Sequence, residues 1–482
     1  MGAVGAAVGS VMGGGRAHAD DGAPVRVLSG ATLIEGTDAA PLPGAAIVLA
    51  GDRILAVGRQ ADIPLPPGVP VVDLAGKFVI PGLWDMHVHQ TETERIFPPL
   101  HVVHGVTGIR EMWGTPRTRD LRRRIELGQA FGPRMVVASN IIDGPPGIWP
   151  QSQVVATEAD GRAAVRQAQR DGADFVKVYS LLSRETYLAV ADESHRAGLR
   201  FAGHLPTQVA VGEAVDMGQH TLEHMIGMLV ATSSRAAELH AELRAMDPST
   251  LNVGTFAPLL EQTAAQTFSP DIAEALADRM IRRGTWLSPT LVVMQRFLSG
   301  GPPGDPSDDR LRYMPPSFKT WWQNLGAQSE PAPIRAAMQA NHRARVRVLG
   351  AMHAAGVGIV AGTDCANPFV FPGFALHEEL ELLVQAGLPP LRALQAATRD
   401  AARCLGMEHL TGTVEPGKFA DLVVLDADPL AAITNTTRIH AVVSRGRYLG
   451  PEDRTRILRD VEAAAAADTT GTPVGGFHAC CG

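Results

Sequence analysis

The stretch DFVKVYSLLSRETYLAVADESHRAGLRFAGH, residues 174–204, decides the fold. An apolar run of strand length (174–180) precedes a helix-like segment (183–199), and a second apolar run (200–204) follows it. A strand, a helix and a strand in this order form a unit whose two strands are parallel. We therefore expect neighbouring parallel strands here, joined by a helix that covers one face of the sheet.

The same alternation extends over residues 81–408. Further apolar runs are MVVAS (135–139), TWLSPTLVV (285–293) and VGIVAGTD (357–364), and TEADGRAAVRQAQRDGA (157–173) is helix-like. So many strand–helix units in one domain favour a closed barrel. We predict an α/β fold, a (β/α)₈ TIM-type barrel.

Residues 226–345 are expected to form one long, irregular insertion in the barrel. It holds Tyr313, Trp321 and Trp322 and the proline-rich stretch GGPPGDP. Long loops at a barrel face often act as lids, so we interpret this insertion as a candidate aromatic lid.

The two ends of the chain lack helical periodicity. VRVLSGATLIEG (25–36) and VVDLAGKFVIPG (71–82) are β-rich runs punctuated by glycine, and GTVEPGKFADLVVLDADPL (412–430) and IHAVVSRGRYL (439–449) resemble them. We predict a small β-sandwich domain made by both ends, from residues 20–80 and 409–455.

Composition sets broad limits on partners. The 482 residues include 50 acidic and 43 basic residues, for a net charge of −7, without a basic run. This balance argues against nucleic acid as a partner. Beyond the leader the chain has no apolar run of the ~18 residues that a membrane span needs. We expect a homo-oligomer that takes a small-molecule or peptide substrate.

The two termini are expected to lie outside the folded body. Residues 1–19 are small and apolar and end in Ala17-His18-Ala19, a small-x-small pattern typical of signal-peptidase sites. This predicts a periplasmic or secreted protein, and a cytoplasmic one if the leader is no signal. Residues 456–482 are expected to be a flexible tail.

Metal-binding residue types recur at the ends of the predicted strands. His87 and His89 in LWDMHVHQ are two residues apart, so on a strand their side chains point the same way. His204, His224 and Asp364 each end a later strand. Because barrel active sites form at the carboxyl ends of the strands, these residues together predict a metal site.

Lys177 is the one lysine of an otherwise apolar strand. A buried ammonium is costly, so burial favours the neutral amine, which can capture CO₂ as a carbamate. The carbamate would offer two oxygens able to bridge two metals.

Each of these residues also has a structural interpretation. A histidine at a strand end is often a hydrogen-bonding partner, and Asp364 after Gly-Thr resembles a helix cap. In GQHTLEH, His220 and His224 could instead form an i, i+4 pair on a helix.

PGLWDMHVH, the strand lysine, the separated histidines and AGTD together resemble the amidohydrolase superfamily, in its subtype with two metals bridged by a carboxylated lysine. Residues 376–430 are similar to the branch of prolidases and imidazolonepropionases, which includes Xaa-Pro dipeptidases and ochratoxin-degrading amidases. The resemblance covers residues 25–450. It implies two divalent metals, expected to be Zn²⁺, with these ligands: His87, His89 and Asp364 on one metal, His204 and His224 on the other, and a carboxylated Lys177 on both.

The resemblance further implies hydrolysis of an acyclic amide bond in a dipeptide or N-acyl amino acid. Metal-activated hydroxide attacks the carbonyl, and Asp364 moves the proton. Tyr179 is a candidate for contacting the oxyanion or the substrate carboxylate, with a core role as its alternative. Arg110 is a candidate carboxylate anchor, with a structural ion pair as its alternative.

Other functions remain open. Lactone or carbamate esterases share the chemistry. A deaminase with one metal would not need Lys177 and would carry a glutamate shortly after His204, where this chain reads HLPTQVAV. A non-catalytic scaffold would be expected to lose ligands, and none is lost.

Overall fold

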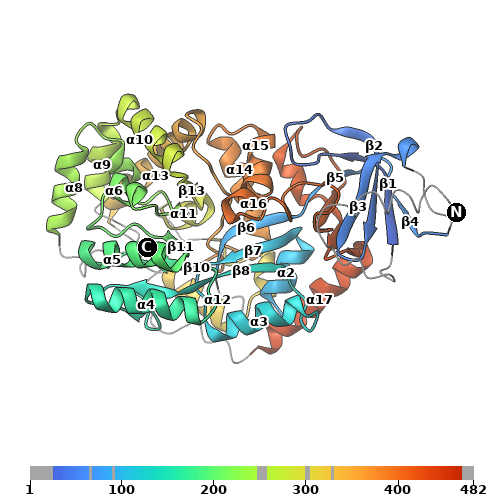
Figure 1. Cartoon of the computed structure of the whole chain (residues 1–482), viewed down its shortest axis with the longest axis horizontal. Coiled ribbons are helices and arrows are strands. Elements are labelled where there is room, and N and C mark those ends of the chain that lie inside the picture. The colour runs from blue at the N-terminus through green and yellow to red at the C-terminus, as the bar shows by residue number, and fades with distance from the viewer. Residues whose placement is uncertain are drawn as a thin grey trace.

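The computed structural model describes residues 25–63, 68–89, 93–246, 258–298, 304–326 and 331–468. A small sheet lies at one end of the molecule, on the right of Figure 1, and combines strands from both ends of the chain. Its strands are β1 Val25–Leu33, β2 Leu42–Ala50, β3 Arg53–Arg59, β4 Val71–Asp73, β5 Phe78–Pro81, β14 Leu422–Leu425, β15 Ile439–Ser444 and β16 Arg447–Leu449.

The two ends of the chain meet where β5 pairs antiparallel with β14, with Ile80 opposite Val423. The hydrogen-bonded order is β16-β15-β14-β5-β1-β2-β3, with β4 beside β1. The predicted β-domain built from both termini is confirmed, and its strands are bonded into one continuous sheet.

Parallel strands lie at the centre of the molecule (Figure 1), and their side chains are largely buried. These strands are β6 Leu83–Val88, β7 Val106–Glu111, β8 Arg134–Asp143, β10 Phe175–Val178, β11 Arg200–Gly203, β12 Thr221–Glu223 and β13 Trp286–Ser288, with the two-residue β9 Gln153–Val154 beside β8. Residues 359–365 take the eighth place, through parallel bridges from Ile359 to Leu287 and from Cys365 to Val88. The predicted barrel is confirmed.

Helices follow the strands and cover the barrel. They are α2 Phe97–Val103, α3 Pro116–Glu126, α4 Glu158–Arg170, α5 Arg184–Ala197, α6 Val211–Asp216, α10 Pro270–Arg283, α13 Ala332–Ala354, α14 Phe374–Gln385, α15 Pro390–Ala396 and α16 Arg399–Leu405. The helix α5 shows how the sequence sets their ends. The side chain of Ser183 accepts a hydrogen bond from the backbone N–H of Thr186 at its start, and Gly198 ends it with a left-handed φ of 68°.

The prediction of one irregular insertion over residues 226–345 is wrong. This stretch carries the barrel strand β13 and is largely helical, since it also holds α7 Met228–Ala231, α8 Ala236–Ala245, α9 Pro258–Gln266, α11 Leu291–Leu298 and α12 Pro316–Gly326. The periodicity of short helices was masked by the prolines between them.

The interpretation of Tyr313 and Trp322 as part of an aromatic lid is also wrong. Trp322 is fully buried, and Tyr313 nearly so, in an apolar cluster with Phe97, Phe318 and Phe371. Aromatic side chains bury a large apolar area, so these rings stabilise the body of the protein.

The flexible tail predicted from residue 456 is wrong as far as residue 467. The helix α17, Pro451–Ala467, has a proline and two acidic residues in its first turn, a favourable helix start. Val461 and Ala465 pack into the same aromatic cluster, and Arg454 donates a hydrogen bond of 3.0 Å to the carbonyl of Val103.

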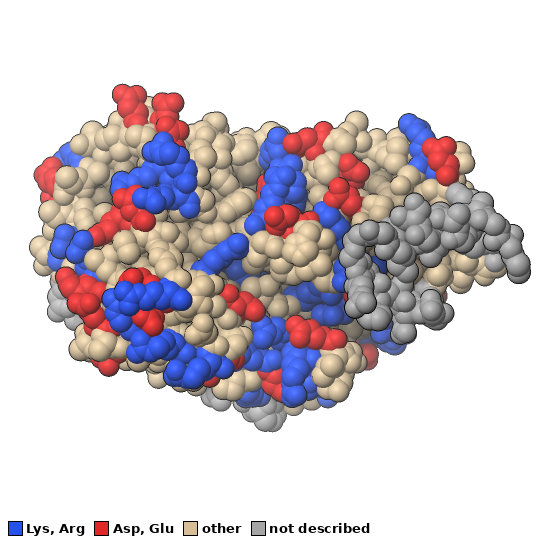
Figure 2. All heavy atoms as spheres, viewed as in Figure 1, with Lys and Arg blue, Asp and Glu red and all other residues tan. Residues whose placement is uncertain are grey.

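Charged side chains of both signs are interspersed over the face drawn in Figure 2. Within the described residues, every helix is too short or too polar to cross a membrane. The expected signal peptide 1–19 and the rest of the expected tail, 469–482, lie outside the described residues.

Candidate metal centre

The structure brings the six predicted ligands to one end of the barrel. His87 lies near the end of β6 and His89 just beyond it, Lys177 lies on β10, and His204 and His224 directly follow β11 and β12. Asp364 lies on the eighth strand position, next to the bridge from Cys365 to Val88. Five of the six side chains are completely buried, and His89 is 7% exposed.

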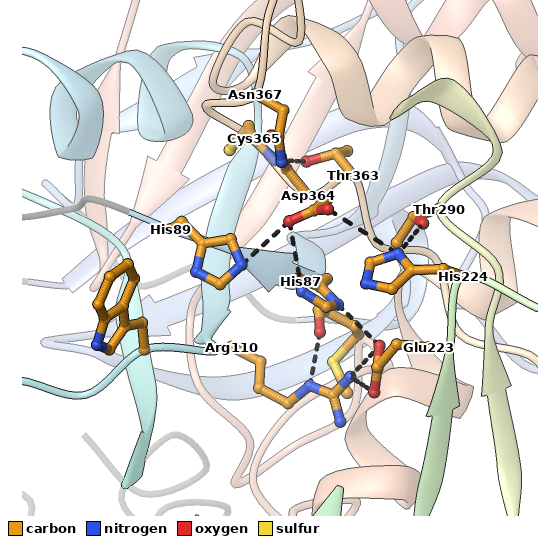
Figure 3. Close-up of polar contacts among 12 residues, drawn as sticks. His87, His89, Arg110, Glu223, His224, Thr290, Thr363, Asp364, Cys365 and Asn367 are labelled. Atoms are coloured by element: carbon orange, nitrogen blue, oxygen red, sulfur yellow. Dashed lines mark hydrogen bonds and ion pairs between the residues drawn. The ribbon is translucent and has the colours of Figure 1, made fainter. Parts of the chain in front are cut away.

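The four imidazole rings form a continuous cluster. Ring centroids are 5.2 Å apart for His89 and His87, 4.7 Å for His87 and His224, and 4.7 Å for His224 and His204. Figure 3 shows three of these rings around the carboxylate of Asp364. Its Oδ1 lies 3.0 Å from Nε2 of His89 and 3.4 Å from Nε2 of His87.

Lys177 reaches this cluster along a path that only a glycine leaves open. It pairs with Ala202 on β11, one residue before Gly203. A Cβ atom at Gly203 would lie 3.0 Å from Cδ of Lys177 and 2.2 Å from the carbonyl oxygen of Val178, and the φ of 131° also favours glycine. The lysine side chain therefore packs directly against the residue that precedes His204.

Hydrogen bonds orient three of the histidines through Nδ1. The partner of His87 is Glu223 at 2.8 Å, that of His204 is Ser180 at 2.8 Å, and that of His224 is Thr290 at 2.7 Å. Such bonds fix the ring and direct Nε2 toward a metal. The sequence pattern did not indicate these three partners, although Glu223 directly precedes His224 and Ser180 lies three residues after Lys177.

Arg110 makes its hydrogen bonds within the protein itself, which favours its structural alternative over the role of a carboxylate anchor. Its Nε donates to the carbonyl of Met86 at 2.6 Å, and its Nη2 donates to Glu223 at 2.9 Å. The side chain of Thr221 completes this buried network, as it accepts from Nη1 of Arg110 and donates to Glu223. Arg110 and Glu223 thus form a buried ion pair, which is the structural alternative for Arg110 (Figure 3).

Tyr179 lies against the candidate ligands and is completely buried. Its ring stacks on that of His204, with centroids 4.0 Å apart and an interplanar angle of 27°. Its hydroxyl accepts a hydrogen bond of 2.8 Å from the indole N–H of Trp149. The loop after β8 therefore fixes the position of Tyr179 beside the centre.

The backbone at the centre adopts unusual conformations. His224 and Asp364 both have a φ of 62°, and Thr290, the partner of His224, has a φ of 46°. Non-glycine residues pay a free-energy cost of roughly 1–3 kcal/mol in such conformations. Their clustering at the ends of different strands is typical of a functional site.

The donor set fits a divalent metal. His87, His224 and Asp364 offer ligand atoms that all lie within 4.8 Å of one another. Burial holds the pKa of His87 well below its ordinary value, so the imidazole is neutral, the form that binds metal. The buried Nε2 of His87 makes no hydrogen bond within the described part of the chain.

Comparisons with known proteins agree with this architecture. Residues 78–449 match the model of the amidohydrolase family. The imidazolonepropionase of Acidiphilium cryptum is 26% identical over 407 residues, covering 80% of this chain and 88% of that protein. The ochratoxinase of Aspergillus niger is 24% identical over 484 residues, covering 86% of this chain and 83% of that protein.

Two solved structures share the fold. Bottromycin amidohydrolase superposes with a TM-score of 0.69 at 24% identity, covering 96% of this chain and 93% of its own. A Xaa-Pro dipeptidase with bound methionine superposes with a TM-score of 0.65 at 20% identity, covering 88% of this chain and all of its own.

Proposed function

This chain belongs to the amidohydrolase family, and from that premise we propose that it hydrolyses the acyclic amide bond of a dipeptide or an N-acyl amino acid. The family and its relatives indicate a hydrolase of carbon–nitrogen bonds. The observation that carries the finer proposal is the convergence of four histidines, Lys177 and Asp364 in one buried cluster.

The proposed metal content is two divalent ions. In this proposal His87, His89 and Asp364 hold one ion, His204 and His224 hold the other, and a carboxylated Lys177 contributes to both. When bound, such a pair supplies a lowered pKa for water and polarisation of a substrate carbonyl.

The protein's own residues would then bind and orient the substrate and move protons. In this proposal Asp364, within 3.4 Å of both His87 and His89, accepts a proton from the attacking water and passes it to the leaving nitrogen. In this proposal the hydroxyl of Tyr179, whose ring stacks on that of His204, stabilises the developing oxyanion. Burial of the whole cluster excludes bulk water, which strengthens these interactions.

A second candidate is a deaminase that uses one metal. The tight group of His87, His224 and Asp364 favours it, since three such ligands suffice for a single catalytic ion. In this alternative Lys177 is a structural residue.

A substrate screen of the zinc-loaded protein separates the two candidates. Dipeptides and N-acyl amino acids are assayed for the released amine, amino-substituted heterocycles for ammonia, and lactones for ring opening, with Asp364→Asn as the inactive control. Amide cleavage that Asp364→Asn abolishes is the expected result. Release of ammonia from the heterocycles without amide cleavage would contradict the proposal and favour the deaminase.

A further inference from the structure

A pocket of about 400 Å³ lies beside the candidate metal centre, outside the cluster described above. Two of its walls are direct continuations of that cluster: Leu205, Pro206 and Thr207 follow His204, and Ile226 and Gly227 follow His224. Three residues of chain span at most about 11 Å. Thr207 and Gly227 therefore each lie within that distance of a candidate ligand.

The remaining walls come mainly from the helices α6 to α10, of which α6, α8, α9 and α10 are labelled at the left of Figure 1, and they are mainly apolar. Representative side chains are Val211, Val230, Leu243, Ile272 and Leu276. The volume lies within the range of small-molecule sites, which are mostly apolar with a few placed polar groups.

The charged side chains in the lining are already neutralised. Glu261 accepts a hydrogen bond of 2.5 Å from Arg345, and Arg279 donates one of 2.8 Å to Asp216. Burial lowers the pKa of His240, which favours its neutral form. The pocket thus presents no uncompensated charge to an occupant, which favours an uncharged one.

Two polar atoms of the lining, the hydroxyl of Thr207 and Nε2 of His240, lack a hydrogen-bond partner in the described residues. The hydroxyl of Thr207 is buried and makes no hydrogen bond there, while the residue is 8% exposed. A buried hydroxyl without a partner is unfavourable, and a carbonyl at the edge of a bound molecule would satisfy it.

We infer that this pocket binds an uncharged apolar group of the substrate, an aryl or branched alkyl group near the scissile amide, with Thr207 donating to a carbonyl beside it. The assignment of this group to the substrate rests on the proposed amide hydrolysis. The site would make the enzyme selective for amides that carry one bulky apolar substituent on either side of the bond, and poor toward amides that carry none, such as N-acetylglycine.

Direct binding tests the pocket without relying on turnover. The probe is 2-acetylnaphthalene, an uncharged ketone that has no amide bond, titrated by fluorescence into the zinc-loaded full chain. Ala231→Phe places a ring in the pocket and should weaken binding at least tenfold. The matched control is Ala351→Phe, which alters an equally half-buried alanine in a separate cavity of about 390 Å³ and should change binding less than twofold.

Thr207→Val tests the hydroxyl and also serves if Ala231→Phe fails to fold. It keeps the shape and should weaken 2-acetylnaphthalene several-fold while leaving naphthalene, which has no carbonyl, unchanged. No saturable binding to the wild type, or equal effects of Ala231→Phe and Ala351→Phe, would overturn the site. An equal effect of Thr207→Val on both probes would overturn the role of the hydroxyl.

Turnover then tests whether the occupant belongs to the substrate. Ala231→Phe should lower kcat/KM at least tenfold for N-(2-naphthoyl)glycine or for N-acetyl-3-(2-naphthyl)alanine, and less than twofold for N-acetylglycine. If Ala231→Phe weakens probe binding but changes kcat/KM equally for all three amides, the pocket exists and does not bind the substrate. If none of these amides is cleaved, the proposed function fails, and the probe titration still decides whether the pocket exists.

Discussion

Nδ1 of His87 donates a hydrogen bond of 2.8 Å to Oε2 of Glu223, from which it is separated by 136 residues of sequence. Glu223 is completely buried and also accepts from Arg110 and Thr221. Burial raises the pKa of Glu223, whereas the Arg110 cation and the hydrogen bond from Thr221 lower it; the net shift is downward, so the carboxylate is ionised. An ionised partner at Nδ1 makes the opposite nitrogen of His87 a better metal ligand.

Glu223→Gln should therefore weaken zinc binding by roughly 10- to 100-fold, the usual effect of losing such a partner. The substitution keeps the shape but removes the charge that orients His87. Competition with a chelator measures the affinity, and Glu238→Gln, on the exposed surface of α8, is the control. Unchanged zinc affinity in a folded Glu223→Gln would show that the contact is structural only.

Arg110→Met should destabilise the protein and leave substrate selectivity intact. It strands Glu223 as a buried charge without its main partner, and breaking a buried pair in this way typically costs about 3–5 kcal/mol. Denaturant unfolding measures the loss, and KM is compared for substrates with and without a carboxylate. A rise in KM confined to the carboxylate-bearing substrates, at normal stability, would instead support the role of Arg110 as a carboxylate anchor.

The sequence predicted the parts of this fold and site that depend on local pattern. Alternating strand and helix signals suffice to predict the barrel, and an HxH spacing on a strand places His87 and His89 on one face. The burial of Lys177 also followed from its apolar strand. Each of these inferences needs only neighbouring residues.

The remaining features depend on which distant segments meet. The residues around Arg110 in the sequence do not show that its neighbour across the barrel is Glu223, so the sequence alone leaves two alternatives for its role. The interpretation of Trp322 as part of a lid fails because the sequence does not show that Phe97 and α17 lie against it. The helix α17 itself carried helix-start signals at Pro451 and Glu452 that the expectation of a loose tail overlooked.

Glu379 on α14 should make stability fall with rising pH. Burial raises the pKa of its carboxyl to about 8, only partly offset by backbone N–H donors such as that of Val292, at 2.8 Å. In the unfolded chain a glutamate titrates near 4.3. Between these values the folded state holds a proton that the unfolded state has lost, so the free energy of unfolding decreases as pH rises from about 4.3 to about 8.

Outside that window the contribution of Glu379 to the free energy of unfolding does not change with pH. Inside it, the contribution changes by at most about 1.4 kcal/mol per pH unit. Glu379→Gln stays neutral at every pH, so its stability relative to wild type should increase across the window. Urea unfolding at several pH values measures the difference, with the exposed Glu185→Gln as control. A difference between wild type and Glu379→Gln that does not change with pH would contradict the prediction.

Lys177→Ala distinguishes a centre with two metals from one with a single metal. If the carboxylated lysine contributes to both ions, the variant should fall from about two zinc ions per chain to about one. Loss of a ligand should cost at least about 100-fold in kcat/KM, because losing an outer partner alone costs roughly 10- to 100-fold.

Added acetate should restore part of the activity of Lys177→Ala, since a small carboxylate can occupy the space of the missing carbamate. Lys177→Arg should not respond to acetate, because the guanidinium stays charged and fills that space. Elemental analysis and rates with and without acetate provide the measurements, with Lys77→Ala, at a partly exposed lysine of the small β-sheet, as control. Wild-type zinc content and substantial activity in Lys177→Ala would contradict the two-metal assignment, while the barrel and the grouping of His87, His224 and Asp364 would stand.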